Sequence, residues 1–64
     1  MSKKRITVLL VDDHAIARDV FRKMLELESD LQVVGEAQDG RQAVAMAKAL
    51  RPAVVVMDIA PRSI

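Results

Sequence analysis

Apolar residues along the chain follow two kinds of pattern, continuous runs and helical stripes. The segments 5–11, 31–37 and 53–57 are short runs rich in valine, leucine and isoleucine, which is typical of strands buried on both faces. Over 15–28 and 41–50, apolar positions recur every three or four residues, which predicts amphipathic helices. The expected order is therefore strand, helix, strand, helix, strand.

Local signals indicate where the helices begin and end. We expect Asp13 to cap the first helix, and Asp39 with Gly40 to open the second. Pro52 ends the second helix because proline disfavours helical backbone in the residue before it. The residues expected to face inward are Ala17, Val20, Phe21, Met24 and Leu25 in the first helix and Ala43, Val44, Ala47 and Leu50 in the second.

Short connections between alternating strands and helices predict an α/β fold with a parallel sheet. Both crossovers are expected to be right-handed, so a chain that steps to one neighbour of the first strand and then to the other places its helices on opposite faces. The predicted strand order is 2-1-3, with one helix on each face. The sequence shows no repeat and no internal domain boundary, and residues 61–64 form a tail without a recognisable pattern.

Composition excludes several functional classes. The chain has no cysteine, which rules out disulfides, thiolate metal sites and cysteine nucleophiles. Its apolar runs are far shorter than the about 18 to 20 residues of a membrane-spanning helix. The apolar stretch 8–11 is also too short for a secretory signal and is ended by Asp12, so we expect a cytoplasmic protein. Ten basic residues against nine acidic ones give no electrostatic reason to expect nucleic acid or a membrane as a partner.

Carboxylates end the first and third strands. Asp12 and Asp13 follow the first strand, and Asp58 follows the third. Open parallel sheets bind ligands outside the carboxyl ends of their strands, at the point where the connections change direction. Oxygen ligands on a half-open site favour Mg²⁺, which keeps several waters. A carboxylate beside Mg²⁺ can also attack a phosphoryl group and form an acyl phosphate.

Each of these residues also has a purely structural interpretation. Asp12 and Asp13 can serve as a helix cap and a solvated acid, and Asp58 can be a polar strand end. His14 is expected in the first helical turn rather than in a metal site, because the chain has no second histidine and no cysteine. The metal interpretation is favoured because the acids meet on adjacent strands.

Motifs at these positions resemble the receiver domain of bacterial two-component response regulators. They are Val11-Asp12-Asp13-His14, then Val33-Val34-Gly35-Glu36-Ala37 with Asp39-Gly40, and Pro52-Ala53-Val54-Val55-Val56-Met57-Asp58. The middle motif looks most like the subfamily that carries a C-terminal LuxR-type DNA-binding domain. The resemblance covers residues 5–60, about the first half of a receiver, and implies a partial receiver domain with a truncated flavodoxin-like fold.

The resemblance implies a role for each acid. Asp58 would be the phospho-acceptor, and Mg²⁺ would be held by Asp12, Asp13, Asp58 and the backbone carbonyl of Ala60. A histidine kinase would be the partner, and the chain would be a signalling module rather than an enzyme. A Mg²⁺-dependent phosphohydrolase is disfavoured, since Ala60 stands where such enzymes commonly carry a second aspartate. The chain departs from the family pattern in that Pro61 comes one position early.

A chemically silent fragment that self-associates is the alternative function. A chain of 64 residues buries little apolar surface relative to its conformational entropy, so we expect help from a second chain. The third strand would present an apolar, uncharged edge of the kind that pairs with another chain. The residues of this dimer edge are Val54, Val55, Val56 and Met57. We expect a homo-oligomer, most simply a two-fold dimer ordered 2-1-3-3′-1′-2′, with strand exchange as the other geometry.

Overall fold

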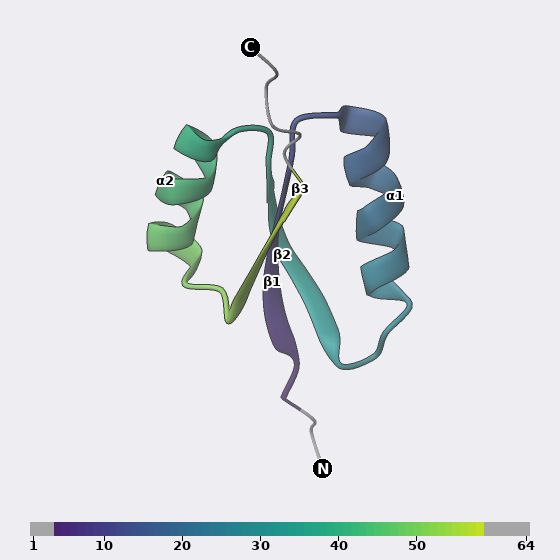
Figure 1. Cartoon of the computed structure of the whole chain (residues 1–64). Helices are drawn as coiled ribbons and strands as arrows, with labels where there is room; N and C mark the ends of the chain where they lie inside the picture. The colour runs from purple at the N-terminus through teal and green to yellow at the C-terminus, as the bar shows by residue number, and fades with distance from the viewer. Residues whose placement is uncertain (1–3, 59–64) are drawn as a thin grey trace.

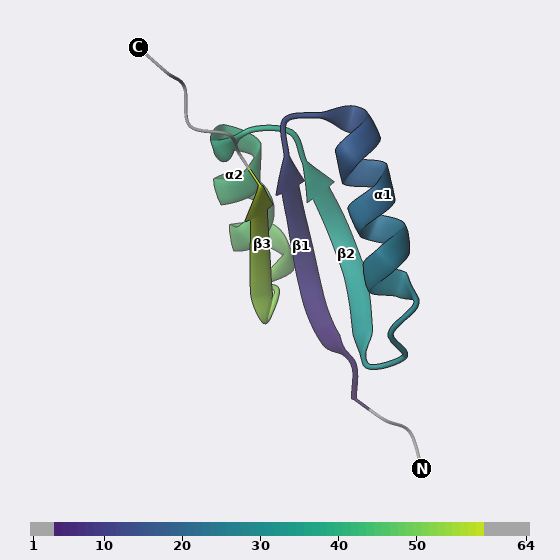
Figure 2. The same cartoon turned by 45° about the vertical axis from the view of Figure 1, so that its right-hand side comes forward.

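The computed structural model describes residues 4–58, which form strands and helices in the predicted order. They are β1 (Ile6–Asp12), α1 (Ala15–Glu26), β2 (Leu31–Ala37), α2 (Gly40–Leu50) and β3 (Val54–Asp58). The strands are parallel and lie in the order β2-β1-β3, which confirms the predicted topology (Figure 2). The two helices lie on opposite sides of the sheet (Figure 1). Neither described helix is long and apolar enough to cross a membrane.

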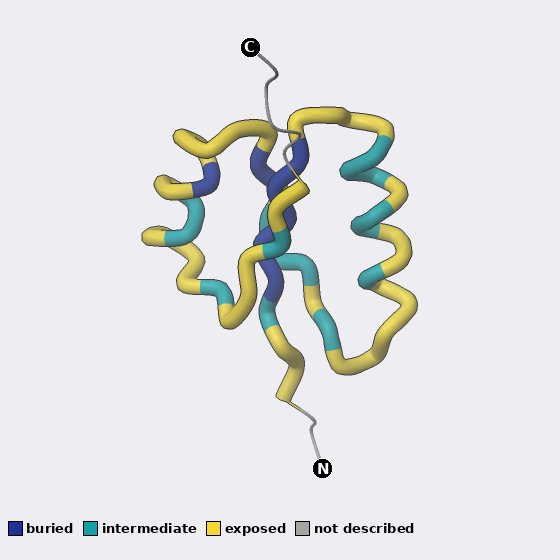
Figure 3. The backbone as a smooth tube through the Cα atoms, in the orientation of Figure 1, coloured by how far each residue is buried: buried dark blue, intermediate teal, exposed yellow. Residues whose placement is uncertain are grey.

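The sheet is built around β1, which is buried from residue 8 to its end (Figure 3). Successive side chains of a strand point to opposite faces, so β1 supplies core residues to both helices. On the α2 side, Leu9 and Val11 form a cluster with Ala37 and Ala43. A strand that is buried on both faces has to be apolar almost throughout, which explains the continuous run in the sequence.

A bulge in β2 brings Gly35 opposite Leu9. The β1–β2 register shifts between Val8 and Leu9, so that Leu9 pairs with Gly35. A Cβ atom on Gly35 would lie 2.7 Å from Met46 Cε and 2.7 Å from Leu50 Cδ1. The absence of a side chain at this position therefore allows α2 to approach the sheet closely.

The helix caps agree with the prediction in α2 and differ from it in α1. The Asp39 side chain accepts a hydrogen bond from Gln42 N at 2.8 Å, as expected for an N-cap. The prediction that Asp13 caps α1 was wrong, because His14 occupies the N-cap position and makes no side-chain capping bond. The helix begins at Ala15, and the cap residue directly precedes the first helical residue, which leaves Asp13 outside the helix.

The apolar stripes of both helices are only partly covered. Among the residues predicted to face inward, those that the structure leaves exposed are Val20, Met24, Val44 and Leu50. The prediction was wrong for these residues because both helices pack mainly on β1 and β2. Within residues 4–58, no element covers the remaining part of each stripe.

β3 forms as predicted but is not buried. Val54, Val55 and Met57 are between 42% and 57% exposed. In the described part of the chain β3 pairs with β1 alone, and the helices pack on the other two strands. The expectation of a strand buried on both faces was therefore wrong for this chain, since burial of a strand requires neighbours at its second edge and over its faces.

The close approach at Gly35 gives a test of the fold. Gly35→Val should lower the free energy of unfolding by about 1 to 3 kcal/mol, because the added side chain would displace Met46 and Leu50. Gly40→Ala is the matched control, since nothing lies within 4 Å of a Cβ there, and its stability should be unchanged or slightly higher. Urea unfolding followed by circular dichroism measures both. Equal stability of the two variants would contradict the packing of α2 on Gly35.

Candidate functional site

The carboxyl ends of β1 and β3 lie side by side at one end of the sheet. The register pairs Asp12 with Asp58 across the two strands. Asp13 follows β1, and His14 is the N-cap of α1, so an acidic turn connects the strand to the helix. Open parallel sheets bind their ligands at this end, beyond the carboxyl ends of the strands.

Asp12 is a buried acid with one unsatisfied oxygen. The residue is 0% exposed, and its Oδ1 accepts a hydrogen bond from His14 N at 2.8 Å. Its Oδ2 has no hydrogen-bond partner among residues 4–58. Burying a carboxylate without partners is costly, so a cation at Oδ2 would relieve an energetic penalty that the fold itself creates. This oxygen fits the Mg²⁺ expected for the site.

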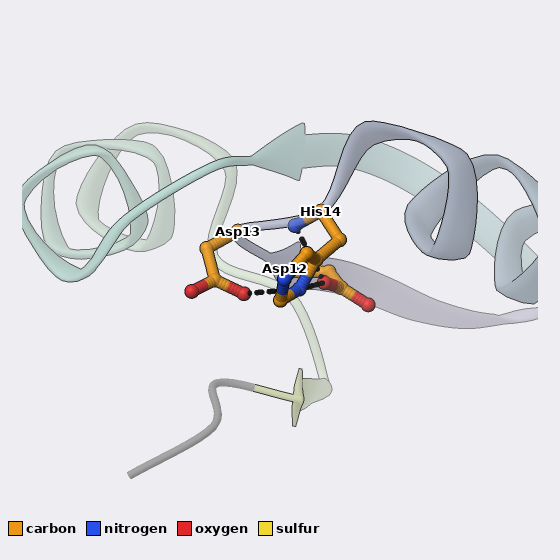
Figure 4. A group of neighbouring side chains, drawn as sticks. All are labelled: Asp12, Asp13 and His14. Atoms are coloured by element: carbon orange, nitrogen blue, oxygen red, sulfur yellow. Dashed lines mark hydrogen bonds and ion pairs between the residues drawn. The ribbon is translucent and has the colours of Figure 1, made fainter. Parts of the chain in front are cut away.

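Asp13 and His14 form an exposed pair beside Asp12 (Figure 4). His14 Nδ1 lies 2.8 Å from Asp13 Oδ1 and 3.7 Å from Asp12 Oδ1. Each residue offers one ligand atom, and these atoms lie within 4.8 Å of one another. Carboxylates suit hard cations such as Mg²⁺ and Mn²⁺, whereas imidazole suits softer metals. The cluster therefore favours a hard divalent cation on the two carboxylates, with the His14 imidazole beside Asp13.

The structure brings together two of the predicted ligands and adds one residue that the sequence argument set aside. Asp12 and Asp13 lie in the cluster, whereas Asp58, on the neighbouring strand, is not part of it. Ala60 lies outside the described residues, so its carbonyl stays a prediction, as does the metal role of the acids. His14 was set aside because the chain has no second histidine and no cysteine; its position directly after two acids was the signal that could have placed it in the cluster.

Comparison with known proteins places these motifs in a family. Residues 8–61 match the model of the response regulator receiver domain. Protein-glutamate methylesterase/protein-glutamine glutaminase 3 of Paramagnetospirillum magneticum is 45% identical over 58 residues, which are 91% of this chain and 16% of that protein. The transcriptional regulatory protein YxjL of Bacillus subtilis is 41% identical over 59 residues, 92% of this chain and 27% of that protein.

The chain is also similar to a solved structure. The crystal structure of the response regulator domain of Thermotoga maritima CheB is 41% identical, with a TM-score of 0.85 over 95% of this chain and 46% of that chain. The fold is therefore that of a flavodoxin-like receiver fragment. The chain spans less than a third of these curated relatives and about half of the solved domain.

The relatives differ in their overall type while sharing this segment. They include methylesterases and transcriptional regulators alike, the regulator LiaR of Bacillus subtilis at 44% identity among them, so the comparisons do not single out one subfamily. The family model covers most of the chain, and the acids at the strand ends lie within the matched residues. The chain belongs to the response regulator receiver domain family.

Proposed function

We propose that the chain is a receiver module of two-component signalling in which Asp58 accepts a phosphoryl group and Asp12 and Asp13 hold Mg²⁺. The observation that supports this most directly is the buried Asp12, whose Oδ2 has no partner in the described part of the chain. Asp12 is also the register partner of Asp58, so the two acids stand at matching positions on neighbouring strands. A divalent cation at this position could be bound by acids of both strands.

The residues of the chain would divide the chemistry between them. An oxygen of the Asp58 carboxylate would attack the phosphorus of a phosphohistidine on a histidine kinase, the phosphorus–nitrogen bond would break, and the imidazole would leave. Asp12 would supply a buried carboxyl oxygen, and the Asp13 side chain, which is 42% exposed, stays accessible to a cation from solvent. Ala60 would contribute its backbone carbonyl. Mg²⁺, when bound, would neutralise charge on the phosphoryl oxygens.

The same proposal includes the subfamily, the location in the cell and the absence of enzymatic activity. The motif in β2 favours the subfamily with a LuxR-type DNA-binding domain, and the expected location is the cytoplasm. We propose that this segment is not itself an enzyme. The methylesterase and glutaminase activities in the name of one relative belong to a protein of which the chain matches 16%.

Self-association through β3 is the second candidate function, and the exposure of that strand favours it. Val54, Val55 and Met57 are exposed, and Val56 is half-buried. Within residues 4–58, the second edge of β3 has no partner strand, and β3 carries no charge before Asp58. A second copy of the chain could pair antiparallel along this edge and close the sheet by two-fold symmetry.

Metal binding should stabilise the fold. At ten times its Kd, Mg²⁺ should add about 1.4 kcal/mol to the free energy of unfolding and raise the melting temperature by roughly 5 to 10 °C, because it binds only the folded state. Asp13→Ala should abolish the rise. Glu28→Ala, which removes an exposed acid from the turn after α1, should keep it. A melting curve of the parent chain that does not move at millimolar Mg²⁺ or Mn²⁺ would contradict a preformed site.

Phosphorylation should be slow and confined to Asp58. The resemblance to receivers implies a lysine that forms an ion pair with the phosphoryl group. Lys4 lies at the opposite end of β1 from Asp58, so we expect that it does not take this role. One such electrostatic partner is typically worth about 10² to 10³ in rate, and we expect labelling by a small phosphodonor to be slower than in a complete receiver by that factor. Intact-mass spectrometry measures it, with Asp58→Asn as the unlabelled control. Rapid stoichiometric labelling would show that Asp58 is phosphorylated without a lysine that pairs with the phosphoryl group.

The dimer edge can be tested by placing a charge on it. Val55→Lys should convert a dimer into monomer and lower its stability, because a charge on an edge strand opposes pairing. Val44→Lys is the matched control, since Val44 is 58% exposed on α2, away from the edge of β3. Analytical ultracentrifugation at micromolar concentration measures the mass. A parent chain that sediments as a folded monomer would refute the dimer.

A further inference from the structure

Arg18 of α1 anchors the backbone of the acidic turn that follows β1. Its Nη1 donates a hydrogen bond to the carbonyl oxygen of Asp12 at 2.8 Å, and its Nε lies 3.3 Å from Glu36 Oε1 in β2. The Arg18 side chain is 20% exposed; its bond to the Asp12 carbonyl is partly buried, whereas its contact with Glu36 is exposed. One guanidinium therefore joins the end of β1 to both β2 and α1.

Glu36 is held from a second direction. Arg22 Nε lies 3.3 Å from Glu36 Oε2, and Arg22 also pairs with Asp19 on its own helix. The hydrogen bond from Arg22 lowers the pKa of the Asp19 carboxyl below its usual value, and a hydrogen bond from Lys23 acts in the same direction. Asp19 is therefore ionised at neutral pH and keeps Arg22 in place, which gives Arg18 a fixed acceptor in Glu36.

Asp12 is fixed through both its main chain and its side chain. Arg18 binds the main-chain oxygen, and His14 N binds the side-chain Oδ1. A rotation of the peptide group after Asp12 would break the bond to Arg18 and would carry Asp13 with it, because Asp13 comes next in the chain. The contact from Arg18 to the backbone therefore helps to set the directions of both carboxylates, together with the bond from His14 N to Asp12 Oδ1.

We propose that Arg18 is a positioning residue of the acidic site, which fixes the backbone at Asp12 and thereby the geometry in which Asp12 and Asp13 meet a divalent cation. This inference rests on the proposed metal-binding function and deepens it, since Arg18 itself does not touch the cation. Groups that orient the ligands of a metal are worth roughly 10- to 100-fold in metal affinity. An effect of that size is measurable in a binding titration.

Arg18→Lys separates positioning from charge. Lysine keeps the positive charge, but its single ammonium on a flexible chain cannot reproduce the fork with which arginine spans the Asp12 carbonyl and Glu36. We expect Mn²⁺ binding, followed by the EPR signal of free Mn²⁺, to weaken by about ten-fold. In the metal-free chain, the His14 amide should exchange faster with deuterium, since its acceptor on Asp12 is no longer held.

Arg22→Lys is the matched control. It makes the same substitution at a residue that contacts Glu36 but not Asp12. Its Mn²⁺ affinity should fall much less than that of Arg18→Lys, because lysine at position 22 keeps a positive charge near Glu36 and the bond from Arg18 to the Asp12 carbonyl stays in place. A merely structural role of Arg18 would predict equal losses in the two variants. Glu36→Gln keeps the size of the side chain and weakens the acceptor of Arg18 Nε, so it should give a smaller loss in affinity. This variant carries the test if Arg18→Lys does not fold.

The outcomes distinguish this inference from the proposed function. Parent-level Mn²⁺ affinity and unchanged His14 amide exchange in Arg18→Lys would overturn the positioning role and leave the metal site intact. An equal loss of affinity in Arg22→Lys would also overturn it, because the loss would then follow general stability. A parent chain that binds no Mn²⁺ would contradict the proposed function and, with it, the role of Arg18 in metal binding.

Discussion

The burial of β1 is the constraint on which the rest of the structure depends. From residue 8 to its end this strand is buried between two neighbouring strands and beneath both helices. A central parallel strand needs apolar cover on both faces, and right-handed crossover connections supply that cover as one helix on each side. β1 ends where the chain turns into α1. The same burial that holds the sheet together therefore takes the Asp12 carboxylate out of water.

The burial of Asp12 links the stability of the fold to the proposed metal site. Removing an ionised carboxylate from water is costly unless partners compensate for the lost hydration. His14 N satisfies one oxygen and Arg18 binds the adjacent carbonyl, while Oδ2 keeps no partner in the described residues. The packing around β1 offsets this free-energy cost in the metal-free chain. A cation that binds Oδ2 would remove the cost, and this gain would favour cation binding. Core packing and the proposed metal affinity are thus linked through one residue.

Sequence periodicity predicted the elements and their order, but not how fully each of them is covered. The bounds of β2, the order 2-1-3 and the acids at the strand ends agree with prediction, because apolar runs and short connections are local properties of the chain. Val20 and Met24 lie on the predicted stripe and are exposed. Periodicity shows which face of a helix is apolar, but it does not show how much of that face the sheet covers. The contact between Arg18 and the Asp12 carbonyl could not be predicted, because no spacing rule encodes a bond from a helix side chain to the main chain of the preceding strand.

β3 connects the two proposed functions, because it carries both Asp58 and the exposed edge. Within residues 4–58 a single ladder, to β1, holds the strand that ends in Asp58. A second strand along its other edge would add a second ladder and restrict the opening of this end of the sheet. If that restriction favours the cation at the acids, the cation favours the pairing to the same degree, since coupling between two binding events is reciprocal. Pairing along the edge of β3 and cation binding at the acids would then be coupled, because the strand with the unpaired edge is the strand that holds the proposed acceptor.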